Sequence, residues 1–497
     1  MIGALDLGFP LLGVINVILI AVIVFVERSD PHRTLSWVLV LVFLPLVGVV
    51  GYIFFSGRLY FRERRLVAAK RHMDLYVRSR LYERFPHLAS EQISIGDPAL
   101  HLYEPVVRMN LTYGQSFYSE ENDVRIFTDG LSKFDALFAD IREAQESIHI
   151  LYYIVRPSEI AKEMVSLLAN KAREGVEVKF LYDDIGSLTV RPSFFKELKD
   201  AGGEVLSFFP RFLGINLAVN YRNHRKIAVI DGRVGYLGGM NLSDEYIHGI
   251  GRLRPWRDTH LRITGPAVAL MQIRFLMDWE ATSGKRSDSL EMDRYFRSPK
   301  EAGSALGRET GDFGQNLGMQ IVSSGPDNLK DDEIRDALIQ MIILARRKVL
   351  IQTPYFIPDP AFIAALKIAS QSGVEVHVMM PGVADHHVVY LASHSYLQDL
   401  LDYGIHVHHY KGFLHAKMIV VDGALATIGT TNIDNRSFVL NFEINTFIYN
   451  RSFAERCEEI FEQDLQSSRP VDQHWFKARP LWWKGASAVT RLLSPLL

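Results

Sequence analysis

The chain has 497 residues, a length that accommodates a membrane segment and a two-lobed soluble body. Its 55 lysines and arginines nearly balance its 57 aspartates and glutamates, and the net charge of −2 argues against nucleic acid as the main ligand. The single cysteine, Cys457, excludes an intrachain disulfide and suits a reducing compartment.

Two uncharged, apolar runs begin the chain, at residues 8–26 and 34–55. Each run is long enough to cross a hydrocarbon core as a helix, and the short segment between them predicts a tight transmembrane hairpin over residues 1–60. Pro45 in the second run is compatible with a membrane helix and predicts a kink. The alternatives are a cleaved signal peptide, for which the basic leading region is missing, and a pair of buried core helices.

Six basic residues follow the second apolar run closely. They are Arg58, Arg62, Arg64, Arg65, Lys70 and Arg71. The positive-inside rule therefore places the large domain and both termini in the cytoplasm. The same residues suit contact with anionic lipid headgroups, or serve only to fix the topology. Residues 61–120 form a connecting region that begins with a helical pattern.

The soluble part repeats itself, with a first half at residues 121–280 and a second half at 317–470. Each half alternates helical segments with strands rich in β-branched residues, and the helices that end at Gly175 and Gly373 each precede a new strand. This alternation predicts an α/β fold with a mixed sheet in each half. Residues 281–316, rich in serine, glycine and charged residues, predict a surface linker with one short helix.

The C-terminal tail, residues 471–497, combines aromatic and apolar side chains with scattered basic ones. Trp482, Trp483, Lys484 and Arg491 are typical of a segment that contacts a membrane interface. The same composition also suits packing against the soluble body. We expect the interface contact, because a lipid substrate would arrive from that bilayer.

The pattern His-x-Lys-x4-Asp occurs twice in the chain, and each copy is followed by an asparagine at the same distance. The residues are His224, Lys226, Asp231 and Asn241 in the first half, and His415, Lys417, Asp422 and Asn432 in the second. Two copies in one register indicate two half-sites that face each other. Together they would form one active centre with a nucleophile and an acid.

Strand geometry gives this pattern a physical meaning. Because residues i and i+2 on a strand share a face, His224 and Lys226 point the same way, as do His415 and Lys417. The aspartate of each copy points away from that face, and we expect it to hold a turn or to support the site. Two imidazoles, two ammonium groups and two asparagine amides around one cavity are suited to binding a phosphate group.

The predicted chemistry is nucleophilic catalysis by histidine. One neutral imidazole attacks phosphorus and forms a phospho-histidine, while the other protonates the leaving oxygen and then deprotonates the incoming hydroxyl. The lysines and asparagines stabilise charge on the phosphoryl oxygens. We expect no cofactor and no metal, because the sequence has no HExxH, Cys-His or Asp-x-Asp pattern. His406, His408 and His409 are interpreted as a lip around the phosphate pocket rather than a metal cluster.

Four further segments accompany the paired motif. They read Trp-Arg-Asp-Thr-His at 256–260, Thr-Pro-Tyr-Phe-Ile-Pro at 353–358, Gly-Phe-Leu-His at 412–415 and Asn-Ile-Asp-Asn-Arg-Ser-Phe at 432–438. With them, the chain resembles the bacterial cardiolipin synthases of the phospholipase D superfamily over nearly its whole length. The resemblance implies a two-lobed fold whose halves pack sheet to sheet, with the site at the seam. It also implies that an acidic side chain holds each catalytic ring, Asp258 for His224 and Glu443 for His415.

The resemblance implies a phosphatidyltransferase of the bacterial inner membrane that acts on phospholipids. One phosphatidylglycerol would lose glycerol to form a phosphatidyl-histidine enzyme, with His224 as the nucleophile by analogy. A second phosphatidylglycerol would then accept the phosphatidyl group, giving cardiolipin. The alternative is a phospholipase D-type hydrolase, in which water attacks the same intermediate. The near-neutral charge and the apolar runs disfavour a superfamily nuclease, and the duplicated motif disfavours a non-enzymatic scaffold. Protein partners stay open.

Overall fold

The computed structural model describes residues 13–27, 31–55, 63–81, 95–210, 220–288, 292–296, 311–314, 317–326, 332–492 and 494. The chain divides into two compact units. The first comprises Met1–Tyr60 with Phe209–Tyr221, and the second comprises Phe61–Phe208 with Arg222–Leu497. All residues of the paired motif belong to the second unit.

The first unit consists of short apolar helices. Residues 13–21 are helical and continue into η1 (Val22–Glu27), and α2 (Pro31–Phe43) is followed by α3 (Pro45–Phe55). The predicted kink at Pro45 is confirmed, but residues 34–55 form two helices and not one kinked helix, because the helix is interrupted at Leu44, directly before Pro45. None of the helices within the ranges given above is both long and apolar enough to cross a membrane.

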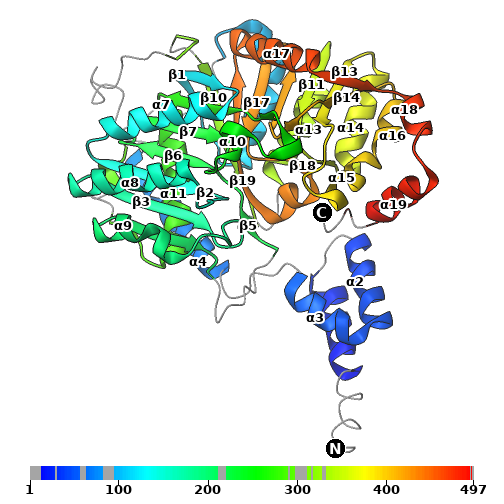
Figure 1. The fold of residues 1–497 in the computed structure, drawn as a ribbon, viewed down its shortest axis with the longest axis horizontal. Helices are drawn as coiled ribbons and strands as arrows, with labels where there is room; N and C mark the ends of the chain where they lie inside the picture. The colour runs from blue at the N-terminus through cyan, green and yellow to red at the C-terminus, as the bar shows by residue number, and fades with distance from the viewer. Residues whose placement is uncertain are drawn as a thin grey trace, which may run out of the picture. The chain divides into compact units, whose positions relative to one another are not determined.

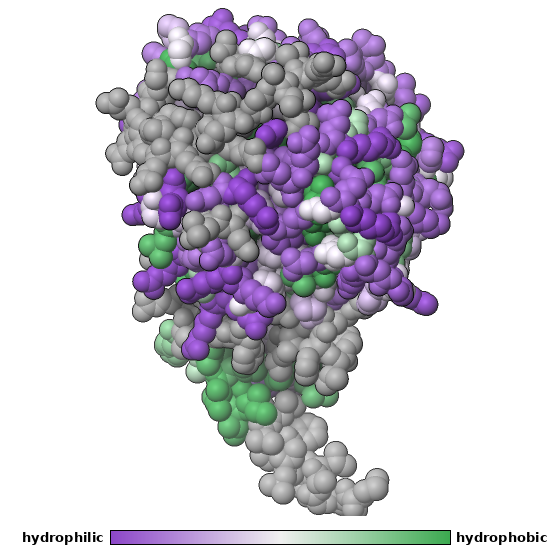
Figure 2. All heavy atoms as spheres, turned by 90° about the vertical axis from the view of Figure 1, so that its left-hand side faces the viewer, coloured by the Kyte–Doolittle hydropathy of each residue, from purple (hydrophilic) through white to green (hydrophobic). Residues whose placement is uncertain are grey.

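Helix α3 folds back on α2 rather than continuing along it. The rings of Trp37 and Tyr52 lie 5.5 Å apart between centroids, whereas 15 residues of straight helix would separate them by about 22 Å. Gly48 makes the close approach feasible, since a Cβ there would lie 2.9 Å from the Leu41 Cα. Large apolar side chains nevertheless remain exposed on this unit (Figure 2). They include Val17, Phe25, Phe43, Leu46 and Val47.

The second unit is built on one mixed sheet flanked by helices (Figure 1). First-half strands are β1 (Tyr118–Phe127), β2 (Ser147–Tyr152), β3 (Glu177–Asp183), β4 (Glu204–Phe208), β6 (Ile227–Ile230), β7 (Val234–Gly238) and β9 (His260–Thr264). Second-half strands are β10 (Leu317–Ser324), β11 (Lys348–Gln352), β13 (Glu375–Pro381), β14 (His406–Tyr410), β16 (Met418–Val421), β17 (Leu425–Gly429), β19 (Asn441–Tyr449) and β20 (Ser468–Val471).

The two halves have the same strand order, which confirms the repeat and the mixed sheet. The first runs β1-β9-β7-β6-β2-β3-β4, and the second runs β10-β19-β17-β16-β11-β13-β14 with β20 added at its edge. The prediction that the halves pack sheet to sheet is wrong. They join edge to edge into one 16-stranded sheet through the antiparallel pair β1–β10. Pairing these two strands satisfies backbone groups that two separate sheets would leave at open edges.

Each half builds its own hydrophobic core between the sheet and its helices. The first-half helices are α7 (Gly130–Glu143), α8 (Glu159–Arg173), α9 (Lys196–Asp200), α10 (Glu245–His248) and α11 (Ala267–Ser283). Those of the second half are α13 (Glu333–Leu344), α14 (Pro360–Gln371), α15 (His387–His394), α16 (Leu397–Asp402) and α17 (Arg451–Gln466). Phe134 packs with Ile148 in the first core, and Leu338 with Val349 in the second.

Two short parallel strand pairs also connect the halves. β5 (Arg222–Asn223) pairs with β19, and β8 (Trp256–Arg257) pairs with β15 (Phe413–Leu414). An ion pair of 3.0 Å between the Arg257 guanidinium and Asp464 on α17 reinforces the second connection. These bridges lie immediately before His224 and His415, so each motif begins against the other half.

The segments outside the two halves are only partly as predicted. The connecting region contains α4 (Glu63–Tyr76), η2 (Val77–Leu81), η4 (Pro98–Tyr103) and α6 (Glu104–Thr112). Much of the predicted linker 281–316 lies outside the described residues. The part within them is not all at the surface, because the buried Tyr295 packs edge-on against His149 at 4.8 Å. The tail forms α18 (Gln473–Lys477) and α19 (Leu481–Arg491).

Candidate active site

The strand bridges place the two motif histidines next to the opposite halves. The backbone N–H of His224 donates to the carbonyl of Phe442 on β19 at 3.0 Å, and that of His415 donates to the carbonyl of Arg257 on β8 at 2.6 Å. Both histidines are buried, with 7% and 8% of their surface exposed. Each histidine therefore enters the site beside the strand that carries the other half's acidic residue.

Each histidine takes its acidic partner from the other half. Nδ1 of His224 donates to Oε2 of Glu443 at 2.9 Å, and Nδ1 of His415 donates to Oδ2 of Asp258 at 2.6 Å. The predicted assignment, with Asp258 on His224 and Glu443 on His415, is therefore wrong. Its physical reason is the pairing of β5 with β19 and of β15 with β8, which crosses from one half to the other. Both contacts leave Nε2 as the reactive nitrogen.

Successive side chains of the first motif point in alternating directions, so the reacting side chains and the side chains that support them lie on opposite sides of the chain. Asn223 and Arg225 both reach the fully buried Asp278, through hydrogen bonds of 3.0 Å from Asn223 and of 3.0 and 2.8 Å from Arg225. His224 and Lys226, at the intervening positions, face the site. This confirms the predicted common direction of the histidine and the lysine.

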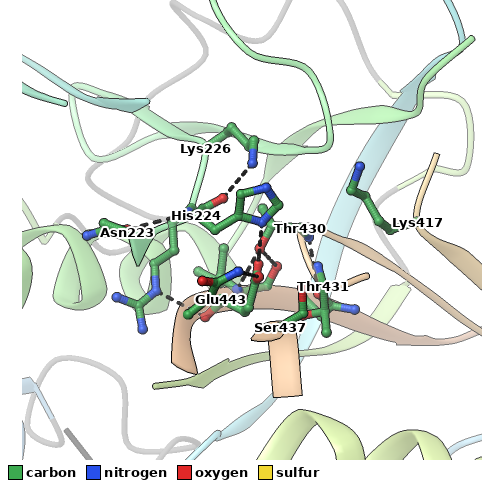
Figure 3. Close-up of polar contacts among 12 residues, drawn as sticks. Asn223, His224, Lys226, Lys417, Thr430, Thr431, Ser437 and Glu443 are labelled. Carbon is green, nitrogen blue, oxygen red and sulfur yellow. Dashed lines mark hydrogen bonds and ion pairs between the residues drawn. The ribbon is translucent and has the colours of Figure 1, made fainter. Parts of the chain in front are cut away.

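The two lysines have equivalent positions in the two half-sites. Nζ of Lys226 donates to the backbone carbonyl of His224 at 2.6 Å, and Nζ of Lys417 donates to that of His415 at 2.6 Å. Figure 3 shows Glu443 on one side of the His224 ring, and the amines of Lys226 and Lys417 on the other. The ammonium groups thus lie on the side of the ring that carries Nε2.

The site is buried, and its two lysines lie among carboxylates of both halves. Burial and then the charge of Lys226 hold the pKa of His224 well below its ordinary value, with further contributions from Lys417 and His415. Burial and the charge of Lys417 lower the pKa of His415 to about 4. Burial also lowers the pKa of Lys417 to about 8 and that of Lys226 well below its usual range. A bound phosphate group would add negative charge beside these groups and favour their protonated forms.

The two carboxylates differ in their surroundings. Glu443 accepts a hydrogen bond from the Thr430 hydroxyl at 2.5 Å and one from the Asn441 amide at 3.2 Å, and burial raises its pKa to about 7. Gly239 stands at the first-half position that corresponds to Thr430. A Cβ there would lie 2.1 Å from Oδ1 of Asp258. In the first half, the Asp258 carboxylate therefore occupies the space that the Thr430 side chain occupies in the second half.

The motif aspartates anchor turns. Asp231 accepts backbone N–H groups of residues 145–147 at 2.8–2.9 Å, and Asp422 accepts those of residues 346–348 at 2.7–2.8 Å. Both have positive φ, 52° and 56°, at the end of the strand that follows the motif. The supporting role expected for Asp231 and Asp422 is confirmed. Because backbone N–H groups occupy both carboxylates, we do not assign them a role in the chemical step.

The two asparagines are not equivalent. Oδ1 of Asn241 accepts the backbone N–H of Ile154 at 3.1 Å, and its Nδ2 donates to the Tyr246 hydroxyl at 2.7 Å. Asn432 is also buried, but its Oδ1 has no hydrogen-bond partner among the residues that the structure describes. The amide of Asn241 is thus committed to the scaffold, whereas the amide oxygen of Asn432 retains bonding capacity inside the site.

Aromatic side chains line the site, and sequence reasoning missed their role. The Tyr153 ring lies edge-on to His224 at 4.7 Å, and the rings of Trp256, Phe413 and Tyr246 lie 5.9–6.0 Å from that of His415. Their positions in the sequence could have indicated this role, because Trp256 comes two residues before Asp258 and Phe413 two residues before His415. Such walls keep the imidazoles out of water.

The histidines expected at the lip of the pocket lie elsewhere. They occupy β14, three strands from β16 in the sheet, where His408 contacts His377 at 2.9 Å and His409 contacts His394 at 3.0 Å. The lip interpretation is therefore wrong. Within the described ranges, no three or more His, Cys, Asp or Glu side chains are arranged to hold a metal ion.

Comparisons with known proteins identify the family of this chain. Residues 137–260 and 338–465 match the family described as cardiolipin synthase, PLD-like domain, and residues 14–57 match the phospholipase D-nuclease N-terminal family. The major cardiolipin synthase ClsA of Bacillus subtilis is 41% identical over 97% of this chain and 98% of its own. The cardiolipin synthase of Oceanobacillus iheyensis is 41% identical over 100% of both chains. The chain belongs to the bacterial cardiolipin synthases of the phospholipase D superfamily.

Membership of this family confirms the predicted resemblance and makes the chain a phosphatidyltransferase. Among solved structures, the phosphatidylserine synthase of Haemophilus influenzae Rd KW20 has a TM-score of 0.60 at 15% identity, covering 79% of this chain and 100% of its own. That likeness concerns the fold alone, and it agrees with an α/β architecture of two repeated halves.

Proposed function

We propose that this enzyme transfers a phosphatidyl group from one phosphatidylglycerol to the glycerol hydroxyl of a second, producing cardiolipin and glycerol. The observation that carries the proposal is the pair of buried histidines, each held by a carboxylate of the opposite half beside two lysines. Such a site could act on many phosphodiesters, and the family of the chain indicates that the substrate is a phospholipid.

In the first step, Nε2 of His224 attacks the phosphorus of the donor lipid. Its lone pair is available because the ring proton is on Nδ1, in the hydrogen bond to Glu443. A P–N bond forms, the P–O bond to glycerol breaks, and His415 as imidazolium gives its proton to the glycerol oxygen. The negative charge of the bound phosphate favours this protonated form of His415, which burial disfavours in the empty site.

In the second step, the acceptor lipid displaces the enzyme. His415, now neutral, takes the proton of the acceptor hydroxyl, whose oxygen attacks phosphorus as the P–N bond to His224 breaks. Asp258 steadies the imidazolium that forms on His415. The site then holds the same protonation states as at the start, so one cycle converts two phosphatidylglycerol molecules into cardiolipin and glycerol.

Lys226, Lys417 and Asn432 stabilise the phosphoryl oxygens. The lysine amines lie on the Nε2 side of the His224 ring (Figure 3). In the empty site each amine donates to a neutral backbone carbonyl, and when substrate binds it can donate to a charged phosphate oxygen instead. Asn432 contributes the amide nitrogen of its side chain as a donor, while Asn241 positions the neighbouring loop through its bond to Ile154.

The acceptor lipid brings a second phosphate, and two arginines beside the first half-site suit it. Arg222 precedes His224 by two residues and shares its face of the chain. Arg436 begins η8 (Arg436–Leu440), and burial followed by the charge of Arg222 lowers its pKa. Both charges also act on Tyr153, which contacts His224. A phosphate between these cations would favour phosphatidylglycerol over water as the acceptor.

We also propose that the enzyme is held at the inner membrane by its N-terminal unit, with the second unit in the cytoplasm. Support comes from the exposed apolar side chains of η1, α2 and α3. The family match at residues 14–57 and the basic residues at the start of α4 add to it. A hairpin that enters the bilayer from the cytoplasmic face accommodates the fold of α3 on α2.

Lipid product analysis tests the proposed reaction. The full-length enzyme in phosphatidylglycerol vesicles, with headgroup-labelled lipid and a chelator present, should release labelled glycerol and form cardiolipin. Phosphatidic acid as the only lipid product would replace the transferase with a hydrolase. No turnover in this assay, followed by turnover after phosphatidylethanolamine is added, would contradict phosphatidylglycerol as the donor.

A further inference from the structure

Helix α19 (Leu481–Arg491) exposes most of its apolar side chains, whereas its hydroxyl residues Ser487 and Thr490 are buried. Leu481, Trp482, Val489 and Leu492 are 85%, 70%, 62% and 79% exposed. The exposed positions are 481, 482, 485, 488, 489, 491 and 492. Apart from Arg491 they are apolar or small, and their spacing forms one stripe along the helix. A helix whose outer face meets water normally has the opposite arrangement.

Polar contacts fix α19 to the second half, one from its buried face and one from the exposed Arg491. Ser487 donates to the carbonyl of Leu391 on α15 at 2.9 Å, and the Arg491 guanidinium pairs with Asp399 on α16 at 2.7 Å. Trp483 packs at this face against Trp475 and Phe476, with ring centroids 5.8 and 5.9 Å apart. Because these contacts set the rotation of the helix, the outward direction of the apolar stripe is a property of the fold.

The tail around this stripe is cationic. Residues 473–492 contain four basic residues, Lys477, Arg479, Lys484 and Arg491, and no aspartate or glutamate. An apolar face with a tryptophan and flanking lysine and arginine is the composition of helices that lie in a lipid headgroup region. A second copy of the same cationic stripe would be repelled, whereas an anionic bilayer would be attracted.

The tail is also connected to the active site. The Asn435 amide donates to the carbonyl of Ser494 at 3.0 Å, and the Tyr396 hydroxyl donates to the Ser494 hydroxyl at 3.1 Å. Asn435 follows β18 (Ile433–Asp434), which begins directly after Asn432. The segment that carries the site's asparagine is thus tied to the end of the tail.

We propose that α19 lies in the headgroup region of an anionic phospholipid bilayer, with its apolar stripe among the acyl chains. This contact seats the catalytic second half on the membrane from which lipid substrates enter. The lipid nature of the substrate rests on the proposed function, whereas the binding of α19 to a bilayer does not.

Site-specific labelling tests the contact in the full-length enzyme. The native Cys457 is buried, so Ala488→Cys on the stripe accepts an environment-sensitive fluorophore selectively. Leu131→Cys, at a 56% exposed leucine on α7, is the matched control. In phosphatidylglycerol vesicles we expect a blue-shifted emission that spin-labelled lipids quench at position 488 only. Equal quenching of both positions by aqueous iodide would overturn the proposal, as would 488–488 crosslinking between copies in lipid-free detergent solution.

Activity provides a second, separable readout. Leu481→Glu with Trp482→Glu should lower turnover of vesicle phosphatidylglycerol about tenfold or more, because charge on the stripe opposes insertion. Turnover of a monomeric short-chain phosphatidylglycerol should not change, and Leu131→Glu should affect neither substrate. An equal loss on both substrates would assign α19 a structural role only. If the unaltered enzyme uses neither substrate, the proposed function fails, while the fluorophore at position 488 still reports the contact.

Discussion

The first and second halves share one strand order but support their histidines differently. In the second half, Thr430 donates to Glu443, whereas in the first half Gly239 leaves its space to Asp258. The first motif also has the fully buried Arg225, where the second has Ala416. The two halves therefore place their histidines and lysines in the same way, but the side chains around the two carboxylates, Glu443 and Asp258, differ.

Arg225 shows how far this difference extends. It pairs with Asp278 within its own half, and it donates to the carbonyls of Ser324 and Glu443 in the other. The first motif is thus held by a buried arginine that forms an ion pair in its own half and hydrogen bonds to the other half. The second motif relies on apolar packing at the corresponding position.

The largest expected effect comes from removing either histidine. His224→Ala and His415→Ala should each lower turnover by a factor on the order of 10⁴ or more. The halves should differ in what accumulates with acyl-labelled phosphatidylglycerol. His415→Ala should retain a slowly formed lipid–protein adduct after denaturation, and His224→Ala should form none. An adduct on His224→Ala would reverse the assignment of the nucleophile.

The crossed acid partners give the next largest effect. Asp258→Asn should reduce turnover roughly 10–100-fold, because the orientation and tautomer of His415 are no longer fixed. Nitrogen NMR of labelled histidine should show the change at His415 and not at His224, and Glu443→Gln should show the reverse. A response of His224 to Asp258→Asn would contradict the crossed arrangement.

The motif aspartates should affect stability rather than chemistry. Replacing either by alanine removes an acceptor from three backbone N–H groups, and we expect a loss of about 2–4 kcal/mol in the free energy of unfolding. Asp422→Ala should cost more than Asp231→Ala, because the Tyr103 hydroxyl also donates to Asp422 at 2.8 Å. Denaturant titration measures both. Asp129→Ala, which removes a single cap bond from α7, is the control at about 1 kcal/mol.

The pH dependence of the second half-site should follow Lys417. Burial lowers the pKa of this ammonium to about 8, so the charged form that binds phosphate is lost as pH rises through that value. The specificity constant kcat/KM should therefore fall about tenfold per pH unit above this pKa. Lys417→Arg should move this alkaline limb upward, because a guanidinium stays charged. An unchanged limb in a profile from pH 6 to 10 would exclude Lys417 as its cause.

The smallest effect tests the asymmetry directly. Thr430→Gly installs the residue of the first half and removes the hydroxyl that donates to Glu443. A loss of about 3–10-fold in kcat is expected, the worth of one such hydrogen bond. Thr430→Ser keeps the hydroxyl and should keep the rate. If both variants lose activity equally, the methyl group rather than the hydrogen bond is responsible.

Much of the site could be predicted from the sequence because it depends on local geometry. The i, i+2 spacing of His224 and Lys226 sets a common direction on any extended segment. The odd spacing of Asp231 likewise set it apart from the reacting groups. Repeated glycine-ended helices and β-branched strands were enough to indicate a mixed sheet in each half.

The partners across the halves could not be predicted, because they depend on which strands pair over a long separation in sequence. Asp258 lies 34 residues after His224 and Glu443 lies 28 after His415, and this spacing favoured acids from the same half. The hydrogen bond between Asn241 and the backbone of Ile154 could not be predicted either. The packing of α3 against α2 after Leu44 could not be predicted, because hydropathy measures the length of an apolar run and not its direction.

The chemistry of this protein could be predicted from the amino-acid sequence, because the two histidines, the two lysines and the family that uses them can all be recognised there. How these groups are combined depends on the folded chain. The β1–β10 pair made one sheet of two, the crossed bridges exchanged the acidic partners, and the docking of α19 turned its apolar stripe outward. The physical reason is that side-chain chemistry is encoded residue by residue, whereas strand pairing and helix rotation are chosen by the free energy of the whole fold.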